Sequence, residues 1–228
     1  DIGPQTLAYS ACGAADLVEL ADQVQNIEQM KRRLQRKLDR SRRATNPDNY
    51  ADNGTIRRGV KLTHNKSNRY RRTQRELRYL QHCQAEIRKR QHIELANHLL
   101  ALGDCFYVED MAWPSLTHRA KETAISEKTG RIKRKKRFGK SVANKAPATL
   151  IGILEQKCNS LGLPGVMKVP TSLRASQYNH QSGEYTSKPL SQRWNNMPDG
   201  ERIQRDLYSA FLLQHYDPKA GNFDSALL

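Results

Sequence analysis

The chain lacks any long apolar run, and this excludes one class of protein. No stretch approaches the roughly 18 consecutive apolar residues that a membrane-spanning helix needs. No segment combines a basic face with large aromatic residues, so binding to a membrane surface is also disfavoured. We therefore predict a protein without a membrane partner.

Cysteine is sparse and scattered along the chain. Cys12, Cys83, Cys105 and Cys158 stand singly, without the close pairs of a zinc site or the density of a disulfide-stapled secreted domain. A reducing compartment fits this pattern. The sequence also opens at Asp1 without a methionine or a signal-peptide pattern, so we expect a fragment or a processed chain in the cytoplasm.

Positive charge is what the chain has in excess. Its 228 residues include 39 Lys and Arg against 23 Asp and Glu, a net charge of +16. This excess favours a polyanionic partner, and nucleic acid is the leading candidate. We expect three segments to contact phosphates, through Arg32, Arg33, Arg36, Lys37, Arg40 and Arg43, through Arg71 and Arg72, and through Lys133, Arg134, Lys135, Lys136 and Arg137. The alternative for each is a solvated surface, or a localisation signal for the third.

The spacing of apolar residues predicts several helices. Apolar residues recur every third or fourth position between residues 27 and 38, which predicts a basic amphipathic helix that ends near Arg43. Residues 67–102 contain neither Gly nor Pro, and they predict a second, long helix. Further helices are predicted from Pro147 to Gly162 and after Gly200, and residues 119–145 are expected to be a basic, mobile insertion.

Strands are predicted between these helices, so the fold class is α/β. Residues 6–10 and 16–20 predict a hairpin near the start of the chain. Residues 105–108 form a short continuous apolar run, which is typical of a central strand covered on both faces. Residues 165–169 predict a further strand.

Three acidic residues stand at the edges of these segments, far apart along the chain. Asp1 opens the first hairpin, Glu109 follows the buried strand and Asp206 adjoins the apolar stripe of the last helix. Carboxylates that converge from several elements can hold two divalent ions about 4 Å apart, which activate water for phosphodiester cleavage. From spacing alone, an isolated acid at the end of a strand is more often a cap or a surface charge. Spacing does not choose between Glu109 and Asp110, because neighbours on a strand point to opposite faces.

The segments around these acids resemble the RuvC-like nuclease half of the TnpB family, transposon-encoded RNA-guided endonucleases related to the type V CRISPR effectors. The three segments are Asp1-Ile-Gly-Pro, Val108-Glu109-Asp110-Met and Gln204-Arg-Asp206-Leu-Tyr-Ser-Ala-Phe211. Further similarity, which extends the resemblance over most of the chain, lies in Leu34-Gln-Arg-Lys-Leu-Asp-Arg40, Asn46-Pro-Asp-Asn-Tyr50, Arg137-Phe-Gly-Lys-Ser141 and Pro189-Leu-Ser-Gln-Arg193.

The resemblance implies an RNase H-like fold, in which helices flank a mixed sheet and a long helical hairpin is inserted. The implied domains are a nuclease domain at 1–170 and 201–228, with a helical insertion at about 24–102 and a basic loop at 119–145, and a zinc-ribbon-like insertion at 171–200. In this family the metal-binding acids match Asp1, Glu109 and Asp206, which selects Glu109 over Asp110. Arg205 is expected to contact the nucleic acid.

The activity that the resemblance implies is cleavage of DNA by two-metal hydrolysis. The cofactor would be two Mg²⁺ ions, with Mn²⁺ as a substitute. The partners would be a guide RNA and the target DNA that pairs with it, in a prokaryotic cytoplasm and at the nucleoid when DNA is bound.

Two departures from the family pattern change these expectations. Residues 176–197 contain no cysteine where many relatives have a four-cysteine zinc ribbon, so we predict no zinc site. The N-terminal half that grips the guide RNA in relatives has no counterpart in these residues, so we do not expect them alone to be a competent guided nuclease. The alternatives are a nuclease-silent, RNA-guided DNA-binding regulator and, less favoured, a structural basic RNA-binding protein.

Overall fold

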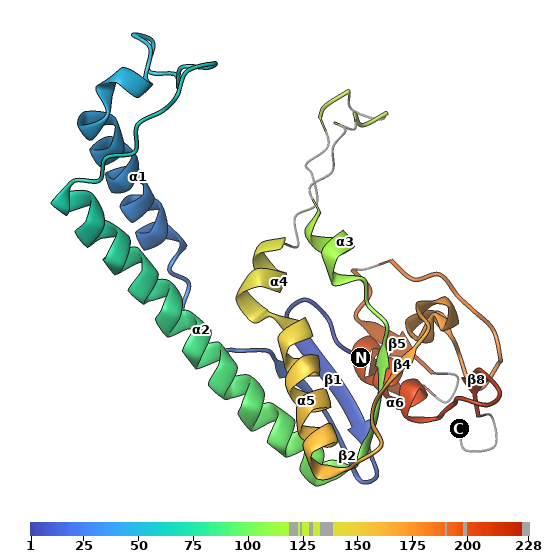
Figure 1. Cartoon of the computed structure of the whole chain (residues 1–228). Coiled ribbons are helices and arrows are strands. Elements are labelled where there is room, and N and C mark those ends of the chain that lie inside the picture. The colour runs from blue at the N-terminus through green and yellow to red at the C-terminus, as the bar shows by residue number, and fades with distance from the viewer. Residues whose placement is uncertain are drawn as a thin grey trace. The chain divides into compact units, whose positions relative to one another are not determined.

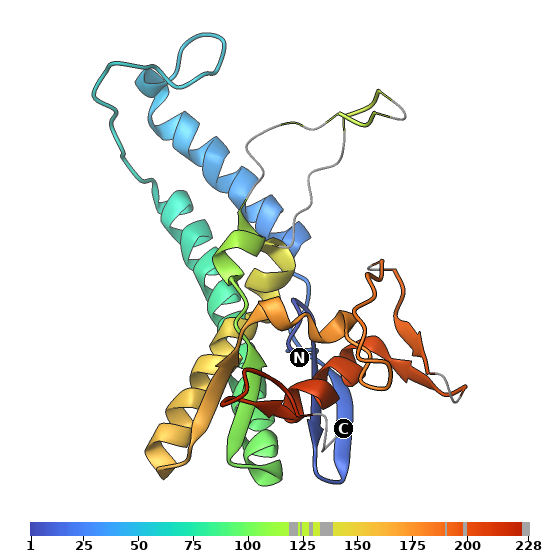
Figure 2. The same ribbon diagram turned by 90° about the vertical axis from the view of Figure 1, so that its right-hand side faces the viewer.

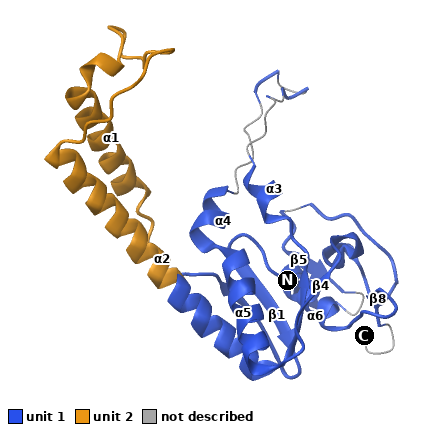
Figure 3. Cartoon of the chain, in the orientation of Figure 1, with its two compact units in different colours: residues 1–22, 89–228 blue, residues 23–88 orange. Residues whose placement is uncertain are grey.

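The chain folds as two compact units that are joined through one long helix. The computed structural model describes residues 1–118, 123, 125–127, 130–132, 139–189, 191–197 and 200–224. Unit 2 comprises residues 23–88, and unit 1 comprises residues 1–22 and 89–228 (Figure 3). The basic run predicted at 133–137 lies outside the described residues.

Unit 2 is built from helices. Its elements are α1 (Glu28–Thr45), the short 3-10 turn η1 (Pro47–Asn49) and the first part of α2 (Asn68–Leu102). Leu34 and Leu38 lie one turn apart and are the buried residues of α1, whereas the basic side chains between them are exposed. The two predicted helices are therefore confirmed, and α1 buries a narrow apolar stripe.

Two buried asparagines fix the loop between α1 and α2. The Asn46 side chain accepts a hydrogen bond from the Asn65 backbone N–H (2.8 Å) and donates to the Asn65 carbonyl (2.9 Å). Asn49 accepts from the Thr63 backbone N–H (2.9 Å) in the same manner. These amides form hydrogen bonds with backbone groups of residues 63 and 65, so they fix the loop between α1 and α2 without a β-ladder.

Unit 1 is mixed α/β, which confirms the predicted class (Figure 1). Besides the end of α2, its helices are α3 (Trp113–Thr117), α4 (Gly139–Lys145), α5 (Pro147–Leu161) and α6 (Arg205–Gln214), with the 3-10 turns η2 (Thr171–Leu173) and η3 (Ala175–Gln177). Its strands are β1 (Thr6–Ala11), β2 (Ala14–Glu19), β3 (Cys105–Glu109), β4 (Gly165–Val169), β5 (Trp194–Asn196), β6 (Arg202–Gln204), β7 (Tyr216–Asp217) and β8 (Asn222–Phe223).

Within the described residues these strands form four two-stranded sheets, and no single RNase H-like sheet is present. β3 and β4 are parallel, and the other three pairs are antiparallel. Phe106 and Val108 pack against one cluster of apolar residues and Tyr107 packs against another, so the expected cover on both faces of β3 is found. The expectation that β3 is central in a sheet is wrong for the described residues, because it pairs with β4 alone. The physical reason is that its second edge faces a cleft instead of a strand.

Local sequence explains where the elements of unit 1 begin and end. Gly13, with a φ of 77°, closes the two-residue turn between β1 and β2, where a side chain would be strained. Pro147 occupies the first turn of α5, and Gly162 ends that helix in the left-handed conformation, as predicted. No described helix has both the length and the hydrophobicity that a bilayer-spanning segment requires.

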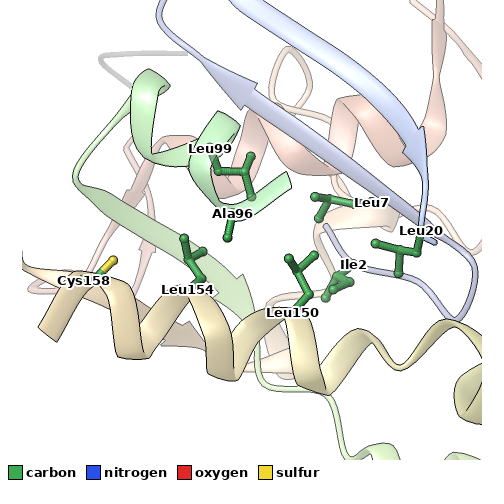
Figure 4. Packing of buried hydrophobic residues seen from close by; sticks show 8 residues of the cluster. All are labelled: Ile2, Leu7, Leu20, Ala96, Leu99, Leu150, Leu154 and Cys158. Carbon is green, nitrogen blue, oxygen red and sulfur yellow. The ribbon is translucent and has the colours of Figure 1, made fainter. Parts of the chain in front are cut away.

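The first core of unit 1 lies between the β1–β2 hairpin, the end of α2, and α5. Figure 4 shows Leu150 and Leu154 pointing from α5 toward side chains of the other elements. The buried members are Ile2, Leu7, Leu20, Ala96, Leu99, Leu150, Leu154 and Cys158. α6 packs on β1 as well (Figures 1 and 2), and Ser10 there donates a 2.7 Å hydrogen bond to Gln214.

The second core attaches the cysteine-free segment 171–200 to α6. It contains Val169, Ala175, Met197, Tyr208, Leu212, Leu213 and Phe223. The Tyr208 hydroxyl lies 2.7 Å from His180 Nδ1 and accepts a hydrogen bond from the His180 backbone N–H (3.0 Å). The ring of Tyr178 lies 5.1 Å from that of Phe223. Apolar and aromatic contacts therefore hold this segment.

Two sequence expectations are corrected here. The final helix begins at Arg205, because Ile203 and its neighbours extend to pair with β5 as β6. Residues 139–145, expected within a mobile insertion, form α4, whose Val142 is buried. In both cases a tertiary contact decides the local conformation.

A truncation in the first core tests how much α5 depends on it. Leu150 is 2% exposed, whereas Leu161 on the same helix is 65% exposed. Leu150→Ala leaves a cavity, and we expect a loss of about 2–5 kcal/mol in the free energy of unfolding. Leu161→Ala should change it by less than about 0.5 kcal/mol. Urea unfolding followed by circular dichroism measures both, and equal losses would contradict the core assignment.

Candidate functional site

The three predicted acids line one cleft of unit 1. Asp1, Glu109 and Asp206 all border a cleft of about 760 Å³. They reach it from the segment before β1, from the end of β3 and from the first turn of α6. The fold therefore places three acids that are distant in sequence along one cleft.

Asp1 is fixed by a pair of backbone hydrogen bonds to β1. Its amino group donates to the Ala8 carbonyl (2.9 Å), and its carbonyl accepts from the Ala8 N–H (2.8 Å). Burial lowers the pKa of this amino group to about 6, and the negative charges of Glu109 and Asp206 act in the opposite direction. That influence shows that the other two acids lie within electrostatic range of Asp1.

Glu109 and its neighbour Asp110 face different surroundings. Glu109, the last residue of β3, lines the cleft, and burial raises the pKa of its carboxyl while the amino group of Asp1 lowers it. Asp110 is exposed, lies outside this cleft, and is 3.9 Å from the ammonium of Lys168. The alternation of side chains along a strand accounts for the difference.

Asp206 is held by basic and amide groups. Its Oδ1 accepts hydrogen bonds from Arg205 Nη2 (3.0 Å) and Nε (3.2 Å), and its Oδ2 accepts from Gln204 Nε2 (3.2 Å). Arg193 Nη1 lies 3.7 Å from the same Oδ2. Gln204 also caps α6 by accepting from the Leu207 N–H (2.8 Å). The carboxylate is therefore neutralised at the helix N-terminus, where negative charge is also favourable.

Cations line the cleft beside the acids. Lys188, Arg193 and Arg205 all border it. Burial, and then the charge of Arg205, lower the pKa of the Lys188 ammonium, which donates to Asn195 Oδ1 (2.9 Å). Arg205 was expected to contact nucleic acid, but sequence reasoning missed Lys188 and assigned Arg193 no role. Proximity of both to Asp206 arises from the folding of segment 171–200 onto α6, which no local pattern reveals.

The acids suit a hard divalent cation in their chemistry, but they are not assembled as a metal site. Carboxylate oxygens are the ligands that Mg²⁺ prefers. Among the residues that the structure describes, no three His, Cys, Asp or Glu residues are grouped so as to hold a metal ion. Arg205 and Arg193 engage Asp206 instead. The donor set therefore fits Mg²⁺, provided that Asp206 exchanges its arginine partners for the cation.

Unit 2 carries most of the excess positive charge. Residues 23–88 contain 18 Lys and Arg and six Asp and Glu, so they account for +12 of the net +16. Arg32, Arg36 and Arg40 repeat every fourth residue along α1 and line a shallow groove. The other predicted phosphate-binding residues of α1 and α2 that are exposed are Arg33, Lys37, Arg43, Arg71 and Arg72.

Arg43 differs from the rest of this set because its guanidinium is already engaged. Its Nε lies 3.1 Å from Asp39 Oδ2, Nη1 donates to the Gly54 carbonyl (3.2 Å), and the group stacks 5.2 Å from the Tyr50 ring centre. Arg43 therefore stabilises the loop after α1. The stripe of Arg32, Arg36 and Arg40 is the better candidate for phosphate contact.

The raised pKa of Glu109 predicts a pH-dependent stability. The folded state binds the Glu109 proton more tightly than the unfolded state, whose pKa is near the ordinary 4.5. The favourable contribution is therefore complete below that value and is lost as pH rises through the folded pKa. We expect Glu109→Gln to raise the urea midpoint at pH 8 and to lose this advantage near pH 4. Asp110→Asn is the exposed control, and an equal gain there would contradict the assignment.

Comparison with known proteins does not indicate a function for this chain. The chain matches no protein-family model and no curated protein. The functional evidence is therefore the cleft of unit 1, which three acids and three cations line, together with the basic surface of unit 2.

Proposed function

We propose that the chain is the RuvC-like nuclease part of a TnpB-type, RNA-guided DNA endonuclease. The observation that carries the proposal is the cleft that Asp1, Glu109 and Asp206 all border. Nothing in the local sequence requires these three residues to converge, yet they are the three that a phosphodiesterase of this kind needs. The cationic side chains of Lys188, Arg193 and Arg205 border the same cleft and can stabilise the negative charge of a phosphate group.

An RNase H-like architecture is part of this proposal. Its support is that the β1–β2 hairpin and the parallel pair β3–β4 lie in one unit with α5 and α6 packed against them. The first acid lies beside β1 and the second ends β3. These are the positions from which strand ends can present carboxylates to one site.

Each side chain of the cleft has a distinct role in the proposed reaction. Bound Mg²⁺ would supply a more acidic water and a charge that stabilises the leaving oxygen. Asp1, Glu109 and Asp206 would hold it. Arg193, whose side chain is 59% exposed, is free to swing toward a phosphate, whereas Lys188 is fixed by Asn195 and binds phosphate in place. Arg205 holds the Asp206 carboxylate in place until a cation replaces it.

Unit 2 is proposed to hold the nucleic acid. Its charge of +12 on 66 residues and the arginine stripe on α1 support contact with phosphates rather than bases. A guide RNA with its paired DNA is the proposed occupant, because such a duplex is read through its backbone shape. Cleavage would need Mg²⁺ or Mn²⁺, whereas binding of the nucleic acid would not.

Removal of one acid tests the nuclease. We expect Asp206→Asn or Glu109→Gln to reduce Mg²⁺-dependent cleavage of single-stranded DNA on the order of 100-fold or more, because each removes a charge that stabilises the transition state. The assay uses the full-length protein together with the RNA that co-purifies with it, because these residues alone are not expected to be a competent guided nuclease. Asp110→Asn, a neighbouring carboxylate outside the cleft, is the matched control and should cut normally. Undiminished cleavage by the Asp206 variant would contradict the assignment of Asp206 as a catalytic acid.

A nuclease-silent, RNA-guided DNA-binding protein is the second candidate. The observation in its favour is that two arginines engage Asp206 and that the described residues contain no assembled metal group. Titration with Mn²⁺, followed by its electron paramagnetic resonance signal, separates the two. Binding of Mn²⁺ that Asp206→Asn weakens favours the nuclease, whereas DNA binding without cation uptake or cleavage favours the silent protein.

The arginine stripe on α1 makes a prediction about salt dependence. If Arg32, Arg36 and Arg40 contact phosphates, replacing all three by Gln should reduce the slope of log affinity against log salt by about 2 to 3. Fluorescence anisotropy with labelled RNA at several salt concentrations measures this slope. Replacement by Lys preserves the charge and should preserve the slope. Equal slopes for the Gln variant and the parent would place the phosphate contacts elsewhere.

A further inference from the structure

The two tryptophans of the chain lie in different surroundings. Trp113 packs against the first core of unit 1. Trp194, the first residue of β5, belongs to neither of the two cores that the described residues form, and it is 49% exposed. A single exposed ring is ordinary on a protein surface, so the groups around Trp194 decide what it can do.

The β5–β6 hairpin has an inner face and an outer face. Asn195 pairs with Ile203, and directly paired residues of an antiparallel ladder share a face. Asn195 is 3% exposed and Ile203 packs against the second core, so this face is the inner one. Side chains alternate between faces, so Trp194 lies on the outer face with its partner Gln204. The hairpin is therefore anchored without the Trp194 ring.

Arg202 lies on the same outer face as Trp194. It pairs with Asn196, which is two residues from Trp194 along β5. The guanidinium carbon of Arg202 lies 5.5 Å from the centre of the Trp194 ring, a cation–π contact that orients the ring. Arg202 is exposed, so its charge remains accessible to an anion.

The outer face of the hairpin adjoins the cleft that the three acids border. Gln204, the partner of Trp194, borders this cleft and donates to Asp206 Oδ2 (3.2 Å). Arg193, the residue before Trp194, borders the cleft as well. The Arg205 N–H donates to the Arg193 carbonyl (2.8 Å), so backbone pairing continues from the hairpin to the cleft. The exposed ring is therefore next to the cations of the cleft in both strands.

An exposed aromatic ring beside cations is the combination that binds a single strand of nucleic acid. Each base stacks on a ring through its flat face, and the cations neutralise the phosphates on either side. The net charge of +16 favours a polyanion, and the ring favours one that has flat apolar faces. A base within a duplex is covered on both faces by its neighbours, so an unpaired base fits better.

We propose that Trp194, oriented by Arg202, stacks on one unpaired base of a nucleic-acid strand that enters the acid-lined cleft. Arg202 and Arg193 bind the phosphates next to that base. The inference rests on the proposed function in taking nucleic acid as the partner, and it adds a base contact that the acids and cations of the cleft do not supply. It requires neither a metal ion nor cleavage.

Fluorine nuclear magnetic resonance tests the contact on the parent protein. The full chain, freed of nucleic acid at high salt, carries fluorotryptophan, and Trp194→Phe identifies the Trp194 resonance. In the presence of EDTA, we expect a thymidine oligomer of about eight nucleotides to shift this resonance and to leave that of Trp113 in place. An abasic oligomer with the same number of phosphates should shift neither.

Affinity for the two oligomers separates stacking from a structural role of the ring. Trp194→Leu should weaken binding of the thymidine oligomer on the order of 10-fold and leave binding of the abasic oligomer unchanged. Trp194→Phe keeps a ring and should retain most of the affinity. Tyr185, which is 48% exposed in the same segment 171–200, provides the control, and Tyr185→Leu should bind like the parent. Fluorescence anisotropy in EDTA measures these affinities.

The other outcomes contradict the proposal. An unmoved Trp194 resonance with bound oligomer, or an equal loss of affinity for both oligomers in Trp194→Leu, would show that the ring and Arg202 only stabilise the hairpin. Binding of neither oligomer would also overturn the proposal. Because EDTA prevents metal-dependent cleavage, a protein that stacks on the base but does not cut with Mg²⁺ would refute the proposed nuclease and leave this contact established.

Discussion

The candidate site depends on the two hydrogen bonds between Asp1 and Ala8. They hold the first residue against β1, with Ile2 buried beneath it, and so aim one acid into the same cleft as the ends of β3 and α6. Without that rung the first carboxylate would move freely, and a metal site needs ligands that are fixed by the scaffold. The position of Asp1 is therefore a property of backbone pairing rather than of its own side chain.

Charge is divided between the units according to what each must do. Unit 2 keeps its arginines largely exposed, which suits a surface that exchanges counterions for phosphates. Unit 1 pairs Asp206 with two arginines inside one cleft, and this keeps the burial of that charge tolerable. Arg205 stabilises the folded cleft by the same contact that a cation would have to displace.

The sequence predicted the helices well because their signals are local. The stripe of Leu34 and Leu38, and the pair Pro147 and Gly162, needed no knowledge of the rest of the fold. The sheet was less predictable, since the apolar run at 105–108 indicates a covered strand but does not say what covers it. Sequence spacing also could not place Lys188 beside Asp206, because that proximity arises from the second core.

The way in which segment 171–200 is attached has a consequence for how it responds to its surroundings. A metal-clamped loop keeps its shape as long as the ion is supplied, and a chelator releases it. This segment is held by the Tyr208 hydroxyl and by rings and apolar side chains shared with α6. Burial of that kind weakens on cooling and carries a large heat-capacity change. The contacts of the second core therefore make the positions of Lys188 and Arg193 at the cleft sensitive to temperature.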